Sequence, residues 1–335
     1  MSHHHHLSIT EREKLLVLHT EQKSLRSISE EMGRSISTIS RELSRKSGTH
    51  GKYSAIKAQH DYLYRRKKCR RAKLLENEEL KMVIQKLFLE QQWSPEQISN
   101  RLAYENSPYQ ISYNTIYRGI YAGMFDTDVQ KYSTGNRRAI KKLRHKGKLR
   151  RGKGNEETRG KIVISNRIQE RPIEAEQRKV IGHWEADTLL GKVNSVCLVT
   201  ITDRRSRYLL AGKIDKKWSE LLANKMISMF SGIPKDYLKT VTPDRGKEFA
   251  KHKEVTAALG GIQFYFPDPH APWQRGTSEN TNGLLREYFP KSFEIGSYSD
   301  DDIAVFVDKL NRRPRKCLNW RTPHEVFFDQ LFHLT

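Results

Sequence analysis

The sequence is poor in cysteine and in long apolar segments. Its 335 residues include only three cysteines, Cys69, Cys197 and Cys317, which lie far from one another. Isolated cysteines cannot build a disulfide framework or a Cys-based zinc site, and they are typical of a reducing compartment. The longest apolar run, around residues 196–201, is far too short to cross a bilayer, and no apolar segment near the N-terminus indicates a signal peptide. We therefore expect no membrane contact.

Acidic residues are scarce relative to basic ones. The chain has 61 Lys and Arg against 39 Asp and Glu, which gives a formal net charge of +22 and a pI of about 9.8. Residues 65–73 and 137–153 concentrate the excess. Such a positive field attracts a polyanion, and phosphate contact is the usual reason for it. The alternative is a solvated charged surface, but two clusters beside helical DNA-reading patterns favour nucleic acid as the partner.

The length of the chain predicts two or three domains. The pattern changes from helical to alternating strand and helix near Lys161. We therefore expect a multidomain chain, with an α-helical N-terminal part and an α/β domain after it. The predicted units are a first helix-turn-helix domain at 7–50, a basic helical connector at 51–92, a second helix-turn-helix-like unit at 93–123, a basic linker at 124–172 and an α/β domain at 173–335.

The first predicted unit has the pattern of a helix-turn-helix. Thr10 and Glu13 fit a capping box at the start of the first helix, and Gly33 can take the left-handed conformation that a sharp turn between the next two helices requires. In the last helix Ile36, Ile39 and Leu43 are expected to face inward. The opposite face suits the major groove, because short hydroxyls allow close approach and Arg contacts guanine through two hydrogen bonds. The candidate DNA contacts are Arg34, Ser37, Thr38, Ser40, Arg41 and Arg45. A plain helical hairpin is the alternative.

A second unit repeats this pattern. Ser94, Pro95 and Gln97 predict a strongly capped helix start, and a break at 106–108 precedes a short helix that ends at Gly119 or Gly123. The short helix offers small polar groups and one Arg on its outer face. Its candidate DNA contacts are Asn114, Thr115 and Arg118.

The C-terminal half predicts a sheet flanked by helices. Three strands, at 181–189, 196–202 and 208–213, come first and are expected to be antiparallel. A helix at 219–230 leads to a fourth strand at 238–242, and a further helix leads to a fifth strand at 262–266, before a long helix from Gly276. This order matches the ribonuclease-H-like, integrase-type fold with a mixed five-stranded sheet.

Three acidic residues occupy matching places in this order. Asp187 lies on the first strand, on the same face as His183 and Glu185, Asp244 follows the fourth strand, and Glu279 lies on the last helix. Converging carboxylates need cations to neutralise them. Ligands that offer only oxygen suit Mg²⁺ or Mn²⁺, and two such ions activate a nucleophile and stabilise the leaving oxygen of a phosphodiester. A surface acid or a helix cap is the alternative for each residue alone.

Several motifs in the chain resemble those of a known family. They are His183-Trp184-Glu185-Ala186-Asp187-Thr188, Asp244-Arg245-Gly246-Lys247-Glu248-Phe249 and the run at 272–286, together with Ile39-Ser40-Arg41-Glu42-Leu43 and Trp93-Ser94-Pro95-Glu96-Gln97-Ile98. These segments resemble the bacterial insertion-sequence transposases of the IS30 family, which are DDE transposases of the retroviral-integrase superfamily. The resemblance covers nearly the whole chain.

The resemblance implies that Asp187, Asp244 and Glu279 are a catalytic triad that binds two Mg²⁺ or Mn²⁺ ions. It also implies that the helical units bind the terminal inverted repeats of a mobile element. The chain departs from the family at Arg245, where the family usually has Asn, and a cation there would either contact DNA phosphate or weaken metal binding. The further candidates for DNA contact on and beside the last helix are Arg275, Asn282 and Arg286, and Trp273 is either a stacking platform for a base or buried.

These observations predict a DNA transposase that cleaves 3′ ends and transfers them to target DNA. Its partners would be double-stranded DNA and at least one further copy of the chain, because strand transfer needs two ends together, and its place would be the bacterial cytoplasm, on the nucleoid. Two alternatives remain. One is a non-catalytic DNA-binding regulator that keeps the α/β domain for assembly, and the other is a structure-selective nuclease of the same fold.

Overall fold

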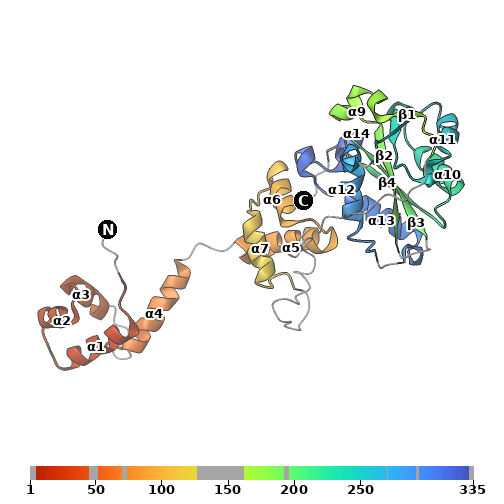
Figure 1. Ribbon diagram of the computed structural model, residues 1–335. Coiled ribbons are helices and arrows are strands. Elements are labelled where there is room, and N and C mark those ends of the chain that lie inside the picture. Colours follow the sequence, from red (N-terminus) through yellow and green to blue (C-terminus); the bar gives the residue numbers. More distant parts are fainter. Residues whose placement is uncertain are drawn as a thin grey trace. The chain divides into compact units, whose positions relative to one another are not determined.

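The computed structural model describes residues 5–44, 52–69, 74–126, 162–191, 196–269, 271–291 and 294–331. The chain forms two compact units, Met1–Glu76 and Asn77–Thr335 (Figure 1). Four predicted features fall wholly or partly outside the described residues: Arg45, the basic segments at 65–73 and 137–153, and the linker at 124–172. Within the described ranges, every helix is too short or too polar to cross a bilayer.

The first unit is a small helical bundle. Leu15, Ile28 and Ile39 are fully buried in its core, and Gly33 takes the expected left-handed conformation, with φ of 62°, between the second and third helices. Its helices are α1 (Ile9–Thr20), α2 (Leu25–Met32), α3 (Ile36–Ser44) and α4 (Ala55–Lys68).

Two local predictions for the first unit are wrong. The capping box of α1 is made by Ser8 and Glu11, not by Thr10 and Glu13, because the same pattern of hydroxyl and acid occurs two residues earlier in the sequence. Ile36 is 46% exposed, because it is the first residue of α3 and extends past the packed part of the bundle. The first unit also contains a buried ion pair, in which Arg12 Nε donates to Glu42 Oε1 at 2.7 Å.

The second unit begins with further helices that pack against the C-terminal end of the chain. Ser94 and Gln97 form the predicted capping box. Of the two ends expected for the next helix, Gly119 is wrong, because the helix continues to Tyr121, and Gly123 is close, because it follows the helix end in a left-handed conformation with φ of 75°. Arg101 Nη2 donates to Glu325 at 2.5 Å, and both side chains are buried. The boundaries expected at 92 and 172 therefore lie inside one compact unit. The helices of this part are α5 (Glu78–Gln85), which a π-helical turn at Lys86–Glu90 extends, α6 (Pro95–Tyr104) and α7 (Tyr113–Tyr121).

A mixed sheet forms the centre of the second unit, as the strand pattern predicts. The strand order is β1-β6-β5-β2-β3-β4, in which β2, β3 and β4 are antiparallel and β2, β5, β6 and β1 are parallel. The sheet has six strands instead of five, because residues 166–167 lie beside β6 as a two-residue strand that is too short to leave a periodic pattern. The strands are β1 (Asn166–Arg167), β2 (His183–Leu190), β3 (Cys197–Asp203), β4 (Leu209–Ile214), β5 (Thr240–Thr242) and β6 (Gln263–Phe266).

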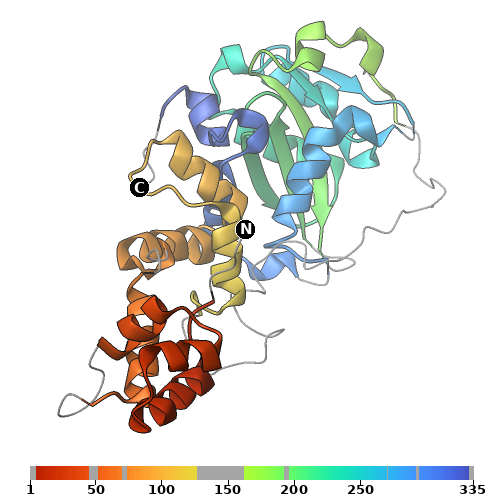
Figure 2. The same ribbon diagram turned by 90° about the vertical axis from the view of Figure 1, so that its left-hand side faces the viewer.

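Helices cover both faces of this sheet (Figures 1 and 2). Alternate residues of β2 face opposite layers, so that Trp184 packs among α10 side chains such as Phe230, and Leu189 packs among α12 side chains such as Leu285. Glu185 and Asp187 therefore lie on the α12 face. The helices of the sheet region are α9 (Ile173–Gln177), α10 (Ser219–Phe230), α11 (His252–Ala258), α12 (Gly276–Leu285), α13 (Asp300–Asn311) and α14 (Pro323–Phe328).

Candidate active site

Asp187 and Asp244 lie beside one another on neighbouring strands, Asp187 within β2 and Asp244 just past the end of β5. In the parallel pair of β2 and β5, Glu185 stands opposite Thr242. Extending this register by two residues places Asp244 opposite Asp187, because paired strands advance together. The predicted positions of these two acids relative to the sheet are thus confirmed.

One guanidinium group reaches both aspartates. Arg275, which directly precedes α12, has its Nη1 3.7 Å from Asp187 Oδ2 and its Nη2 3.6 Å from Asp244 Oδ1. The three side chains are 15–20% exposed, so that the site is accessible to solvent but not open on all sides. Arg275 acts here as an internal cation between the two carboxylates, although the sequence suggested it as a DNA contact.

Local hydrogen bonds fix the orientation of the Asp187 carboxylate. Asn282 Nδ2 donates to Asp187 Oδ2 at 3.1 Å, and the backbone N–H of Thr188 donates to Oδ1 at 2.8 Å. Burial raises the pKa of Asp187 above its ordinary value, Arg275 opposes this rise, and the nearby charge of Asp244 adds to it. A further cation near these carboxylates would therefore stabilise their charged form. The carboxylate oxygens of Asp187 and Asp244 are ligands that suit a hard divalent ion such as Mg²⁺.

Glu279 lies on the side of α12 from which Asn282 reaches Asp187, but its carboxylate does not join Asp187 and Asp244 in the structure. Its side chain is exposed on the first turn of the helix. Among the described residues, no three His, Cys, Asp or Glu side chains form a group that could hold a metal ion. The structure thus brings Asp187 and Asp244 together and leaves the third predicted ligand as a prediction.

Arg245 turns away from the aspartates. Its Nε donates to the carbonyl oxygen of Pro267 at 2.5 Å, and only its backbone N–H contacts Asp244 Oδ1, at 2.6 Å. The side chain at the position where the family usually has Asn is thus held by the chain itself.

A buried ion pair lies two residues before Asp187 on the same face of β2. Glu185 is fully buried and accepts from Arg204 Nη1 at 2.5 Å, while its second oxygen accepts from the backbone N–H of Ser278 at 2.7 Å. The carboxylate therefore ties β2 to the first turn of α12, beside Glu279. Strand alternation predicts that Glu185 lies on this face, but nothing in the local pattern around Arg204 predicts the pairing.

The other predicted residues on and beside α12 differ in whether they contact the chain itself or solvent. Asn282 contacts Asp187, as described above, so that it orients a carboxylate. Arg286 Nη1 donates to the carbonyl oxygens of Leu190 and Phe289, at 2.7 and 3.2 Å, which indicates a structural contact. Trp273 is 74% exposed, and the alternative of a buried ring is thus wrong.

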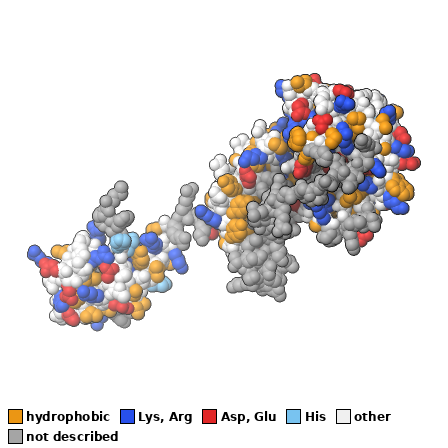
Figure 3. All heavy atoms as spheres, in the orientation of Figure 1, with side chains coloured by type: hydrophobic (Ala, Val, Ile, Leu, Met, Phe, Trp, Pro, Cys, Tyr) orange, Lys and Arg blue, Asp and Glu red, His pale blue; other side chains and the backbone are white. Residues whose placement is uncertain are grey.

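The outer face of α3 is free of the bundle core. Ser37, Thr38, Ser40 and Arg41 are all exposed, as predicted. Arg34 is instead half-buried, with Nη2 2.7 Å from Glu11 Oε1. On the face of the first unit that Figure 3 shows, Lys and Arg side chains are interspersed with acidic ones. The polar residues of α3 are therefore available to a partner, while Arg34 already has one within the chain.

The short helix α7 of the second unit has a similar outer face. Asn114 and Arg118 are exposed, and Thr115 is partly buried, with its Oγ1 2.9 Å from the hydroxyl of Ser112 at the helix N-terminus. Asn114 and Arg118 are thus accessible, and the hydroxyl of Thr115 takes part in the helix cap.

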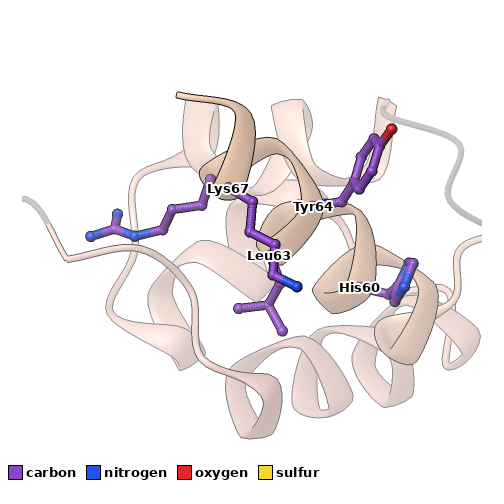
Figure 4. A pocket seen from close by; sticks show the side chains of 5 residues that line it. His60, Leu63, Tyr64 and Lys67 are labelled. Carbon is purple, nitrogen blue, oxygen red and sulfur yellow. The ribbon is translucent and has the colours of Figure 1, made fainter. Parts of the chain in front are cut away.

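Helix α4 carries a hollow of about 600 Å³ in the first unit (Figure 4). Its lining combines the exposed ring of Tyr64 with two cations of the basic segment, Arg66 and Lys67. The residues that line the hollow are His60, Leu63, Tyr64, Arg66 and Lys67. This combination of a ring and cations is compatible with phosphate and base contact.

Comparisons with known proteins agree with this arrangement. A helix-turn-helix domain family matches residues 3–46. The chain is 35% identical over 333 residues to the transposase for insertion sequence element IS1086 of Cupriavidus metallidurans, a match that covers 97% of this chain and 95% of that protein. It is 37% identical over 327 residues to the transposase InsI for insertion sequence element IS30A of Escherichia coli, which covers 96% of this chain and 83% of that protein.

Among solved structures, the catalytic core domain of BIV integrase matches 45% of this chain and 95% of its own length, with 17% identity and a TM-score of 0.35. This likeness is too weak to support a fold assignment. The fold rests on the strand order and register described above.

Proposed function

The chain belongs to the IS30 family of insertion-sequence transposases, and from this premise we propose that it cleaves the ends of a mobile element and joins them to target DNA. The single observation that carries the proposal is that Arg275 reaches both Asp187, within β2, and Asp244, just past the end of the adjacent strand β5. Two carboxylates that share one internal cation are suited to bind another cation at the same place.

Asp187 and Asp244 would hold divalent cations, Mg²⁺ or Mn²⁺. When bound, a pair of such ions lowers the pKa of a water or hydroxyl nucleophile and stabilises the leaving oxygen of a phosphodiester. The protein itself contributes no covalent nucleophile in this proposal, so that no Ser or Tyr is needed. Its task is to position the carboxylates and the DNA strand.

Glu279 is proposed as the third carboxylate. Arg275 and Asn282 come four residues before it and three residues after it, so that both share its side of the chain, and both contact Asp187. Glu279 lies between these two contacts in the sequence, which supports a place for it on the side of α12 toward the aspartates. Its exposed side chain is free to turn toward them when a cation draws the acids together.

The network beneath the site keeps α12 in register with the sheet. Glu185 holds the Ser278 N–H, directly before Glu279, and Asn282 is fixed by Thr200 Oγ1, which donates to its Oδ1 at 3.0 Å. The exposed ring of Trp273 would stack on an unpaired base near the cut, because aromatic faces accept any base. Rigid support of this kind is what a site needs to hold a strand in line for attack.

The helical parts would bind the ends of the element. Arg41 of α3 and Arg118 of α7 are exposed on short helices with small polar neighbours, which suits entry into the major groove. Two such helices indicate a long DNA site. Strand transfer requires two ends together, so that we propose a dimer or a larger assembly on the DNA, working on the nucleoid in the bacterial cytoplasm.

An assay of strand cleavage and strand joining with Mg²⁺, on a duplex that carries the element's end, tests this function. The substitutions Asp187→Asn, Asp244→Asn and Glu279→Gln are each expected to reduce both products by at least about a hundred-fold, the cost typical of a lost electrostatic stabiliser. Asp236→Asn, which changes an exposed acid away from the site, is the matched control and should keep full activity.

The same assay separates the alternatives. A structure-selective nuclease would give cut product without joined product. A regulator that uses the α/β domain only for assembly would bind the end duplex and give neither product. Cleavage that survives the Asp187 and Glu279 substitutions, with DNA binding intact, would show that the proposed triad is wrong.

A further inference from the structure

A small basic hollow lies against α12, apart from the aspartates. It has a volume of about 250 Å³. Three arginines from separate segments and four residues of α12 contribute most of its lining: Arg178, Arg207, Arg315, Gly276, Thr277, Asn280 and Thr281. The hollow is thus a place where cations from distant parts of the second unit meet beside the helix that carries Glu279.

The hollow and the aspartates lie on opposite faces of α12. Successive residues of an α-helix are turned by about 100°, so that residues 277, 280 and 281 share one side, while residues 279, 282 and 286 share the other. The side-chain contacts agree with this division. Asn282 reaches Asp187, whereas Arg207 Nη1 donates to Thr277 Oγ1 at 2.7 Å. The hollow is therefore a separate site and not an extension of the carboxylate site.

The groups around the hollow are suited to an anion. No acidic side chain contributes to its lining among the described residues. Arg207 Nε is buried and has no hydrogen-bond partner within the described part of the chain. Buried donors are normally satisfied, so that this unpaired N–H indicates a missing acceptor. The volume is below the roughly 300–1,000 Å³ of sites that enclose a drug-sized molecule, which favours one charged group of a larger ligand.

We propose that this hollow binds a backbone phosphate of duplex DNA. The proposal rests on the proposed function, because a protein that cuts and joins DNA must hold the duplex on both sides of the reacting bond. Arginine is suited to this role, since its planar group makes paired hydrogen bonds to phosphate oxygens.

The width of α12 sets the spacing between the two sites. A helix with its side chains is about 10–12 Å across, so that the bound phosphate lies a few nucleotides from the phosphodiester at the aspartates. This phosphate belongs either to the end of the element or to the target DNA. The chemistry of the contact is the same in both cases.

Salt dependence of DNA binding tests the proposal with the full chain. Equilibrium binding is measured over a range of salt concentrations with two duplexes, one carrying the element's end and one of unrelated target sequence. The variants are Arg178→Gln, which removes one cation, and Asn280→Asp, which places a negative charge at the hollow without changing an arginine. Lys179→Gln is the matched control, because it removes the same charge from an exposed residue that does not line the hollow. Thermal unfolding checks that each variant is folded.

A lost phosphate contact is expected to reduce the slope of log K against log salt by about 0.9, with little change in the control. A reduction with the end duplex alone assigns the phosphate to the element's end, and a reduction with the target duplex alone assigns it to the target; both results support the site. Unchanged slopes for both variants on both duplexes overturn it. Because no cleavage is involved, this outcome is independent of the proposed catalysis, which fails instead if the wild-type protein produces neither cut nor joined DNA.

Discussion

Two carboxylate–arginine groups lie two residues apart on the same face of β2 and differ in how tightly they are closed. Glu185 and Arg204, the buried pair, are fully enclosed, with a contact of 2.5 Å and a further hydrogen bond from α12. Asp187 and Asp244, the exchangeable pair, share Arg275 at 3.6–3.7 Å and remain partly exposed. The charge of Glu185 is thus balanced by groups of the chain itself, whereas the charges of Asp187 and Asp244 are only partly neutralised.

This difference distinguishes the acids that are available to an external cation from those that are not. A buried carboxylate with a close ion pair and a backbone donor has no unused charge, so that its role is to hold α12 against the sheet. A carboxylate with a long contact to a side chain that solvent reaches can exchange that partner for another cation. The same residue types thus hold α12 against the sheet in one place and are available to an external cation in the other.

The largest expected effect is on the buried pair. Glu185→Gln removes the close counter-charge of buried Arg204 and leaves only Glu176, whose Oε2 lies 3.5 Å from Arg204 Nη2, so that the free energy of unfolding should fall by roughly 3–5 kcal/mol. Chemical denaturation with a midpoint and slope for each variant measures this loss. The double variant Glu185→Gln/Arg204→Met, which removes both charges, should recover much of it. A loss below about 1 kcal/mol for the single variant would remove the distinction between the two groups.

A second prediction concerns His183, the next residue on this face of β2. Burial lowers the pKa of His183 from its ordinary value of 6.5 to about 4, and its Nδ1 lies 2.8 Å from Thr240 Oγ1. Below pH 6.5 His183 is protonated in the unfolded chain, whereas in the folded chain it stays neutral until about pH 4. The free energy of unfolding should therefore fall by about 3 kcal/mol as the pH drops from 6.5 to 4.

The variant His183→Asn should lack this part of the pH dependence. Comparing the unfolding free energies of both proteins at pH 7 and at pH 4.5 isolates it, because the other titrating groups are shared. Equal pH dependence in the two proteins would show that His183 is not enclosed as the buried pair is.

The third prediction concerns cation binding at the exchangeable pair. With Mn²⁺ at ten times its dissociation constant, the wild-type protein should gain about 1.4 kcal/mol of stability. Asp187→Asn and Asp244→Asn should lose this gain while remaining as stable without metal as the wild type. Thermal unfolding with and without Mn²⁺ measures it. Retention of the gain in both variants would place the cation elsewhere.

The smallest expected effect is that of the internal cation. Arg275→Gln removes the charge that competes with a divalent ion for the two aspartates, and Mn²⁺ should bind roughly five-fold more tightly, which corresponds to about 1 kcal/mol. Titration of Mn²⁺ by calorimetry provides the measurement, with Arg286→Gln on the same side of α12 as the control. Weaker Mn²⁺ binding in Arg275→Gln would mean that Arg275 supports the cation instead of replacing it.

Much of the fold could be predicted from the sequence, because the signals involved are local. Alternation along 181–189, the apolar run at 196–202 and the capping pattern at Ser94 each predict an element that the structure contains. The strand at 166–167 could not be predicted, since two residues cannot establish a period. The packing of α6 against α14 through Arg101 and Glu325 also leaves no local trace, because these residues are more than two hundred positions apart.

For the candidate site, the sequence located the carboxylates but not their partners. Asp187 and Asp244 follow from the strand order, and the register of β2 and β5 brings them together. Arg275 and Asn282 contact Asp187, which their spacing alone does not show, and their expected contact to DNA stays a prediction. A side chain on a helix face can be assigned to a side from its spacing, but its partner depends on which strand the helix covers.

The helical units, the order of the strands and the places of Asp187 on one strand and Asp244 just past another follow from the sequence alone, because periodicity and capping act over a few residues. The pairing of each carboxylate with its arginine, the carboxylate and basic faces of α12, and the packing of residues 77–126 with the sheet region in one compact unit arise only on folding. Ion pairs and burial depend on distances through space, and these are fixed only when segments far apart in the chain pack together.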